Sequence, residues 1–150
     1  MELKNKSAFS GALIYLARRP RTIYEVAEWL SRKGVPEEDH SPIIEKLTSL
    51  KLLNDFEYAC SFIRTRNLIK PRSTRVLRME LLKKGVSAAD INAALEVVPV
   101  DETLFARQIL AKNEWKWTAL EKRAQNQKKK EFLLRKGYSW KIINNIGIDN

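Results

Sequence analysis

Apolar residues recur along most of this chain at spacings of three and four, which place side chains on one face of an α-helix. The first such stripe consists of Phe9, Ala12, Leu13 and Leu16. Glycine is scarce, at five residues, and no run of β-branched residues alternates with polar ones as a half-buried strand would. The pattern therefore predicts an all-α protein built from amphipathic helices.

The first stripe returns twice at a fixed interval. Forty-seven residues later the same spacing is found in Phe56, Ala59, Cys60 and Ile63, and after another forty-seven residues in Ala106 and Leu110. A period of this length is typical of tandem helical repeats. The chain thus repeats itself three times.

A second signature marks the end of one helix in each repeat. A basic pair followed by glycine and an apolar residue occurs in segments 30–35, 81–86 and 133–138, with the glycines at Gly34, Gly85 and Gly137. Glycine accepts the left-handed conformation of a helix C-terminus, and the cations complement the negative end of the helix dipole. Each glycine is therefore predicted to end the second helix of its repeat.

Helix starts follow the same logic. Pro36, Ser87 and Ser139 each follow a predicted helix end, and the serines can accept hydrogen bonds from free N–H groups at a helix start. Pro42 predicts that the third helix begins at or just before it, which places His40 in a surface loop. That placement makes a catalytic role for His40 the weaker interpretation.

The second helices also have predicted starts. Thr22 lies three residues before Glu25, which is the spacing of a capping box. In the second repeat either Ser73 or Thr74 fills this position. In the third repeat no boundary stands out, and Trp115 to Lys130 can be read as one helix that continues into Glu131.

Together these signals predict three tandem three-helix repeats that form an elongated, curved array. The predicted repeats cover residues 1–52, 53–99 and 100–150. Repeats of this kind contact mainly their neighbours along the chain. Such an array suits an extended partner.

Composition narrows the classes of function. The chain has 150 residues, 44% of them hydrophobic, and a net charge of +10. Its single Cys60, read as a small core residue, excludes an internal disulfide, and with His40 as the only histidine the chain lacks the ligands of a Cys/His metal site. No glycine-rich phosphate-binding motif occurs. We therefore expect no enzymatic activity, no catalytic residue and no metal or cofactor.

The distribution of apolar residues along the chain bears on where in the cell the protein is located. No stretch approaches 18 consecutive apolar residues, and residues 1–7 are polar and contain lysine. These features predict a soluble, cytoplasmic protein without a membrane partner. We expect it to be a monomer.

Positive charge concentrates in the middle of the chain. Between Arg64 and Lys84 eight residues are basic, and Glu80 is the only acid; the basic residues are Arg64, Arg66, Lys70, Arg72, Arg75, Arg78, Lys83 and Lys84. On the second helix Arg72, Arg75, Met79 and Lys83 are expected to project opposite Leu77 and Leu81. This density favours contact with phosphates or an acidic protein surface. The alternative is a solvated helix face.

A second basic run combines with aromatic residues. Lys128, Lys129 and Lys130 follow Trp115 and Trp117 in the sequence. Interleaved cations and aromatic rings can bind unpaired bases by stacking. The alternative is core packing, which is the preferred interpretation for Trp29 and Trp140. On one helix, Trp115 and Trp117 cannot both face inward.

The repeats resemble the bacterial RecX regulatory proteins. The densest similarity runs from Leu53 to Val86, and weaker matches cover 12–34 and 133–138. Two segments depart from the expected family pattern: Lys70-Pro71-Arg72 replaces a glycine-bearing turn, and residues 39–42 are additional.

The resemblance implies a regulator that binds the RecA recombinase, chiefly as its filament on single-stranded DNA. It also implies inhibition of the ATPase, strand-exchange and coprotease activities of that filament. The alternative is a general helical DNA-binding protein, because three-helix units also occur in helix-turn-helix domains. Amides that could read bases are few on the third helices, namely Asn92, Asn144 and Asn145, so the filament regulator is preferred. The candidate contact residues are the eight cations of the central block and Lys128, Lys129 and Lys130.

Overall fold

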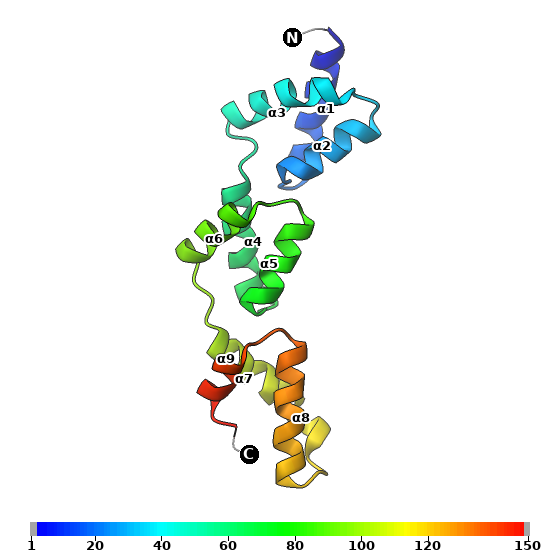
Figure 1. The fold of residues 1–150 in the computed structure, drawn as a ribbon. Coiled ribbons are helices and arrows are strands. Elements are labelled where there is room, and N and C mark those ends of the chain that lie inside the picture. Colours follow the sequence, from blue (N-terminus) through cyan, green and yellow to red (C-terminus); the bar gives the residue numbers. More distant parts are fainter. Residues whose placement is uncertain (1–2, 149–150) are drawn as a thin grey trace. The chain divides into compact units, whose positions relative to one another are not determined.

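The fold is described from a computed structural model covering residues 3–148. These residues form nine α-helices and two short 3₁₀ helices, with no strand among them (Figure 1). The elements are α1 (Leu3–Arg18), α2 (Ile23–Arg32), η1 (Glu37–Asp39), α3 (His40–Ser49), α4 (Asp55–Ile69), α5 (Thr74–Lys83), α6 (Ala88–Val97), α7 (Glu102–Asn113), η2 (Glu114–Trp117), α8 (Lys122–Arg135) and α9 (Trp140–Ile146). The predicted all-α fold is therefore confirmed.

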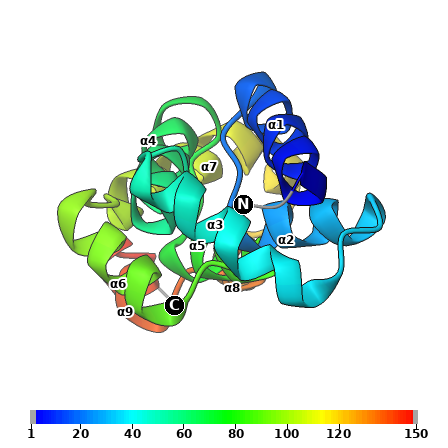
Figure 2. The ribbon, with the colours of Figure 1, turned by 90° about the horizontal axis from the view of Figure 1, so that it is seen from above.

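The helices pack into two compact units. Unit 1 contains the described residues up to 62 together with 81–97, and unit 2 contains 63–80 together with those from 98 onward. Figures 1 and 2 show short connections between successive helices. The division runs through α4 and α5, so each of these helices contributes to both units. The boundaries predicted for three repeats, at residues 52 and 99, stay a prediction.

The core of unit 1 is built from the predicted apolar stripe of α1 and the inward faces of α2 and α3. Its fully buried side chains include Ala12, Val26, Leu30, Ile43 and Leu47. Trp29 packs against this core from α2 and remains partly exposed. Removal of this apolar area from water is the main force that joins the three helices.

The core of unit 2 joins α7, α8 and α9. Ala106 and Leu110 of the third stripe pack with Leu133 and Ile143, and all four side chains are buried. The ring of Trp117 meets the ring of Phe132 edge to face, with 5.4 Å between centroids. The repeat of the stripe thus places Ala12 of α1 and Ala106 of α7 at equivalent buried positions, and Leu110 at the position of the partly buried Leu16.

The predicted helix caps form as expected. Thr22 accepts a hydrogen bond from the backbone N–H of Glu25 (3.1 Å), and the Glu25 carboxylate accepts one from the N–H of Thr22 (3.2 Å). Ser73, Ser87 and Ser139 accept equivalent bonds at the starts of α5, α6 and α9. The three predicted glycines have φ values of +78°, +84° and +91°. Local sequence therefore sets both ends of these helices.

Two further hydrogen bonds tie α2 to later helices within unit 1. The N–H of Ile23 donates to the carboxylate of Asp55 at 2.9 Å, and the hydroxyl of Thr22 donates to the carbonyl of Lys84 at 2.6 Å. Burial raises the pKa of the Asp55 carboxyl, as do the carboxylates of Asp90 and Glu25, although the bond from Ile23 opposes the shift. The start of α2 is thus held by two residues distant in sequence.

Unit 2 repeats this arrangement around the start of α5. The N–H of Thr74 donates to the carboxylate of Glu102 at 2.8 Å, and the hydroxyl of Ser73 donates to the carbonyl of Lys136 at 3.2 Å. In both units a capping hydroxyl meets the carbonyl just before a predicted glycine. The repeat in the sequence is therefore accompanied by a repeated pair of hydrogen bonds, which joins the start of a helix to residues later in the chain.

The predicted loop position of His40 is wrong. Helix α3 begins at His40, which is buried, and its Nε2 lies 2.9 Å from the carbonyl oxygen of Val35. Pro42 falls in the first turn of α3, where a helix does not require its missing N–H. The proline therefore permits the helix to begin earlier than predicted.

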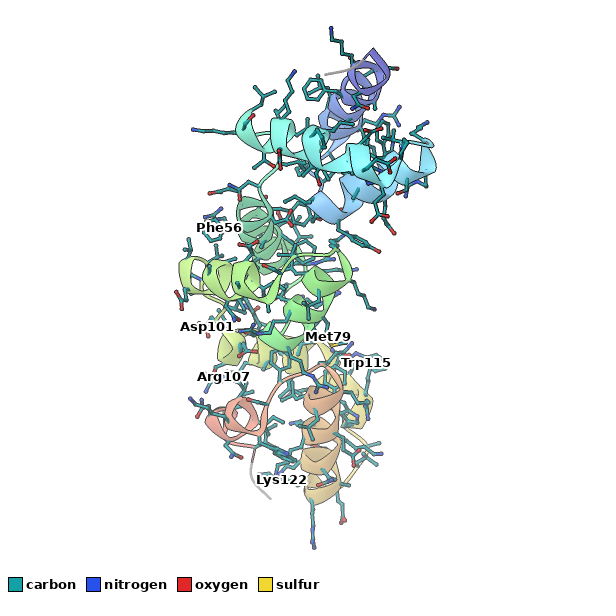
Figure 3. All side chains as sticks on the ribbon, turned by 45° about the horizontal axis from the view of Figure 1, so that its top comes forward. Phe56, Met79, Asp101, Arg107, Trp115 and Lys122 are labelled. Atoms are coloured by element: carbon teal, nitrogen blue, oxygen red, sulfur yellow. The ribbon has the colours of Figure 1, made fainter. Side chains whose placement is uncertain are left out.

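The single helix read from Trp115 to Lys130 is also wrong. Residues 114–117 form η2, and α8 begins only at Lys122. As predicted, only one of the two tryptophans faces inward, because Trp117 is 8% exposed whereas Trp115 is 70% exposed and projects from the ribbon (Figure 3). Core packing of Trp140 was the wrong interpretation, since this first residue of α9 is 56% exposed.

Three smaller observations concern Cys60, membrane-spanning helices and groups that could bind a metal ion. Cys60 is buried, in agreement with its interpretation as a core residue. Over residues 3–148, none of the helices has the length and apolar character needed to cross a bilayer. In the same range, no group of three acidic, histidine or cysteine side chains is arranged to hold a metal ion.

Candidate nucleic-acid and partner interface

A basic groove lies on unit 2 where the connection between α4 and α5 meets α7 and the end of α8. It consists of two hollows, of about 200 and 160 Å³, that share Pro71, Arg72 and Ile109. The remaining lining residues are Ile69, Lys70, Ser73, Val76, Phe105, Gln108, Lys112, Arg135, Lys136 and Tyr138. We call this surface the Arg72 groove.

The lining carries five cations and no acidic residue. Lys70 and Arg72 come from the predicted central block, whereas Lys112, Arg135 and Lys136 come from the ends of α7 and α8. Like charges brought together raise the local positive potential and favour an anionic ligand. The groove is thus suited to phosphate groups or to a carboxylate-rich surface.

The floor of the groove is apolar. Phe105 and Ile109 pack against the core of unit 2, and Tyr138 is 3% exposed. Burial raises the pKa of Tyr138 to about 12; the Glu102 carboxylate adds to this shift and the Arg72 guanidinium opposes it. The phenol therefore stays neutral at physiological pH, and the charge of the groove comes from its cations.

Arg72 is held in place by the single acid of the central block. Glu80 pairs with Arg66 at 3.0 Å and with Arg72 at 3.9 Å. The ion pairs lower the net charge that these two arginines present to a ligand.

The other cations of the block lie outside the groove lining. Arg64, Arg75 and Lys83 are exposed, whereas Arg78 and Lys84 are partly buried. Met79 is also exposed, and Leu77 and Leu81 are fully buried, as the sequence predicted for the two sides of α5. The predicted place of Arg72 on the exposed side of this helix is wrong, because Arg72 precedes α5 and is partly buried.

The second basic run does not join the Arg72 groove. Lys128 pairs with Glu131 at 3.8 Å, and Lys129 pairs with Glu114 at 3.3 Å. Lys130 lines a separate hollow with Arg123 and Gln127. Lys128 and Lys129 are therefore partly neutralised by neighbours, which makes this run the weaker candidate.

Sequence reasoning missed Lys112, Arg135 and Lys136. Arg135 and Lys136 form the basic pair before Gly137, which was interpreted only as a helix end. The equivalent pair in the second repeat, Lys83 and Lys84, was included among the candidate contacts. The repeat itself was therefore the signal that could have identified the missing pair.

Exposed apolar residues adjoin the groove. Leu68 and Ile69, at the end of α4, are 85% and 76% exposed, and Ile69 lines the groove. Adjacent exposed apolar side chains beside a basic cluster favour contact with a protein as well as with phosphates. The arrangement of cations beside exposed apolar side chains is thus suited to binding a surface that is both anionic and apolar.

Comparisons with known proteins identify the family. Sequence models of the first and the second three-helix domain of RecX match residues 8–47 and 54–95. The regulatory protein RecX of Bacillus cytotoxicus is 32% identical over 139 residues, and that of Bacillus pumilus is 34% identical over 142 residues. Each alignment covers 92% of this chain and 52% or 53% of the relative. The chain thus spans about half the length of these curated relatives.

Solved structures show the same relationship. A crystal structure of regulatory protein RecX is similar with a TM-score of 0.87 and 28% identity, covering 97% of this chain and 72% of that one. The crystal structure of RecX from Lactobacillus salivarius has a TM-score of 0.82 and 30% identity, covering 95% and 93%. Sequence and fold agree over almost the whole length. The chain belongs to the RecX family.

Proposed function

We propose that this protein binds the RecA recombinase filament on single-stranded DNA and inhibits its ATPase, strand-exchange and coprotease activities. It acts by binding and has no catalytic activity of its own. Membership of the RecX family supports a regulatory role. The choice of a filament as the partner rests on the resemblance described above and on the mixed character of the groove.

The observation that carries the proposal is the Arg72 groove. Its five cations can neutralise phosphates, because Lys70, Arg72 and Lys112 line one hollow and Arg72, Arg135 and Lys136 line the adjoining one. Cations spread over two adjoining hollows favour an extended anion over a single phosphate. Single-stranded DNA is such an anion.

Leu68 and Ile69 distinguish a filament from bare DNA. Phosphate contacts require cations, whereas these two exposed side chains gain free energy only if an apolar partner surface covers them. A protein filament that carries DNA offers both kinds of surface. A general helical DNA-binding protein, the alternative function, would need only the cations.

The test separates the two contributions with two double variants. Leu68→Ser with Ile69→Ser removes the apolar pair, and Arg135→Ala with Lys136→Ala removes two cations. The apolar variant should lose most of its affinity for the filament and keep its affinity for single-stranded DNA. The cation variant should lose affinity for both. Binding is measured by fluorescence anisotropy, and inhibition by the rate of ATP hydrolysis of the filament.

A matched control replaces another exposed leucine of unit 2. Leu120→Ser changes a residue that is 40% exposed and does not line the groove, so neither affinity should change. If the apolar variant binds the filament as tightly as the unmodified protein, the alternative function becomes the better one.

A further inference from the structure

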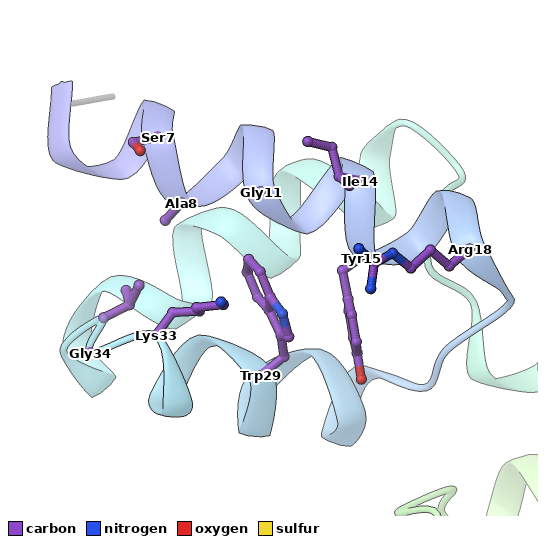
Figure 4. A pocket seen from close by; sticks show the side chains of 10 residues that line it. Ser7, Ala8, Gly11, Ile14, Tyr15, Arg18, Trp29, Lys33 and Gly34 are labelled. Atoms are coloured by element: carbon purple, nitrogen blue, oxygen red, sulfur yellow. The ribbon is translucent and has the colours of Figure 1, made fainter.

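A second groove lies in unit 1 between α1 and α2. It has a volume of about 520 Å³ and is open at the surface. Its lining includes Gly11, Tyr15, Arg18, Trp29 and Lys33, which Figure 4 shows between the two helices. None of its lining residues is acidic.

Two aromatic rings in this groove form a stack flanked by cations. The rings of Tyr15 and Trp29 lie 5.3 Å apart between centroids, with an angle of 18° between their planes. The Arg21 guanidinium lies 4.1 Å from the Tyr15 ring, and the Lys33 ammonium lies 5.9 Å from the Trp29 ring. The order is therefore cation, ring, ring, cation.

The two ends of the stack differ in how firmly they are held. Arg21 is partly buried and pairs with Glu25 at 3.8 Å, so it fixes the Tyr15 end. Lys33 is exposed, and its ammonium lies at the outer limit of a cation–π contact. In Figure 4 Lys33 stands on the side of Trp29 opposite Tyr15. The Trp29 end can therefore accept another planar group when the flexible Lys33 side chain moves.

Gly11 of α1 allows the indole to stand against the helix. A Cβ atom at this position would lie 2.8 Å from Cη2 of Trp29, closer than packed atoms tolerate. Ala8, on the same side of α1, also lines the groove with a minimal side chain. At these two positions α1 adds little bulk beside the indole, which favours a planar ligand.

We propose that this groove is a base-stacking site for single-stranded nucleic acid. An unpaired base stacks on the face of Trp29 opposite Tyr15, and its phosphates pair with Lys33 and Arg18. The stack supplies attraction that does not depend on base identity, and the cations supply attraction that depends on salt. The site deepens the function proposed above by adding a DNA contact in unit 1, and it requires no recombinase.

The test compares two probes of equal length and charge. One is a fluorescein-labelled oligothymidylate, and the other has the same sugar-phosphate backbone without bases. The unmodified protein should bind the first more tightly. Trp29→Leu keeps an apolar side chain but removes the π-face, so it should weaken binding of the thymidylate roughly tenfold and leave binding of the abasic probe unchanged. The melting temperature of each variant establishes that it is folded.

Substitutions of two neighbouring cations, Lys33 and Arg32, test the electrostatic contribution of the groove. Lys33→Ala should weaken binding of both probes, whereas Arg32→Ala, an equal change of charge one residue away and outside the groove lining, should have a smaller effect. Variants of the Arg72 groove should weaken both probes equally and preserve their ratio. This ratio is independent of filament binding, so its result stands apart from the outcome for the proposed function.

The proposal is overturned if folded Trp29→Leu weakens both probes to the same extent or weakens neither. It is also overturned if an acidic peptide with apolar residues competes for the groove and oligothymidylate does not.

Discussion

The α-carbon of Gly85 packs directly against the side chain of Tyr24, 61 positions earlier in the chain and within the same unit. A Cβ atom at Gly85 would overlap Cβ and Cγ of Tyr24. Gly85 also has a φ of +84°, a conformation that favours glycine. This glycine therefore serves two purposes: it ends α5 and it makes room for α2.

The first prediction compares Gly85 with Gly34, the equivalent glycine that follows α2. Gly34 has a similar φ of +78°, but a Cβ atom there would meet nothing within 4 Å. Gly34→Ala should lower the free energy of unfolding by about 1–2 kcal/mol, the cost of the left-handed conformation. Gly85→Ala should cost a further ~1–3 kcal/mol because Tyr24 must move. Urea denaturation measures both; equal costs would contradict the packing role.

A second prediction concerns Glu80, whose substitution is expected to raise the affinity for single-stranded DNA instead of lowering it. Glu80→Gln removes the carboxylate that pairs with Arg66 and Arg72, so the guanidinium of Arg72, which lines the groove, becomes more available to phosphates. Affinity for single-stranded DNA should rise roughly two- to fivefold, as expected from releasing ion pairs worth up to ~1 kcal/mol. Fluorescence anisotropy at fixed salt measures the change.

The control for Glu80 has the same effect on total charge. Glu131→Gln releases Lys128, which lies outside the Arg72 groove. If both substitutions raise the affinity equally, the gain comes from total charge and the groove has no special role.

The helices were largely predictable because their ends are encoded locally. Ser73, Ser87 and Ser139 each cap the helix that follows, and glycine ends α2, α5 and α8 with positive φ. Such signals need only neighbouring residues. His40 was misplaced because its burial and its contact with Val35 depend on packing, which the local pattern around Pro42 does not report.

The candidate site was predictable only in part. The central block was visible as a run of charge, and Lys70 and Arg72 do line the groove. Lys112 and Arg135 lie 40 or more positions from Arg72 along the chain, so their approach follows from the packing of α7 and α8 within unit 2. Charge density along a sequence cannot show which distant cations meet.

A third prediction follows from the buried carboxyl of Asp55. Its pKa is raised above the ordinary value of 3.8, chiefly by burial. Folding therefore favours the protonated acid, and this contribution to stability is complete below pH 3.8 and is lost as pH rises through the higher pKa of the folded state. Asp55→Asn does not titrate and keeps an oxygen that can accept the Ile23 N–H. Its stability relative to the unmodified protein should be greater at pH 7 than at pH 3.

Urea denaturation at a series of pH values measures this difference. Comparing the two proteins at each pH cancels the titration of the other carboxyl groups. A constant difference between pH 3 and pH 7 would show that Asp55 has the same affinity for protons in the folded and unfolded states.

The last prediction tests the groove through the salt dependence of DNA binding. Cations that contact phosphates release condensed counterions, so the affinity for single-stranded DNA falls with a log–log slope of about 0.7 for each contact. Replacing Arg72, Arg135 and Lys136 together with alanine should reduce the slope by about 2 if all three contact phosphates. Replacing Arg75 and Lys83, on the exposed side of α5, tests whether that surface also contributes. Alanine at Lys128 and Lys129, whose ammonium groups already pair with Glu131 and Glu114, should leave the slope nearly unchanged. If the slope is unchanged in the folded variant without Arg72, Arg135 and Lys136 but is reduced in the variant without Lys128 and Lys129, the DNA contact lies at these two lysines and not in the Arg72 groove.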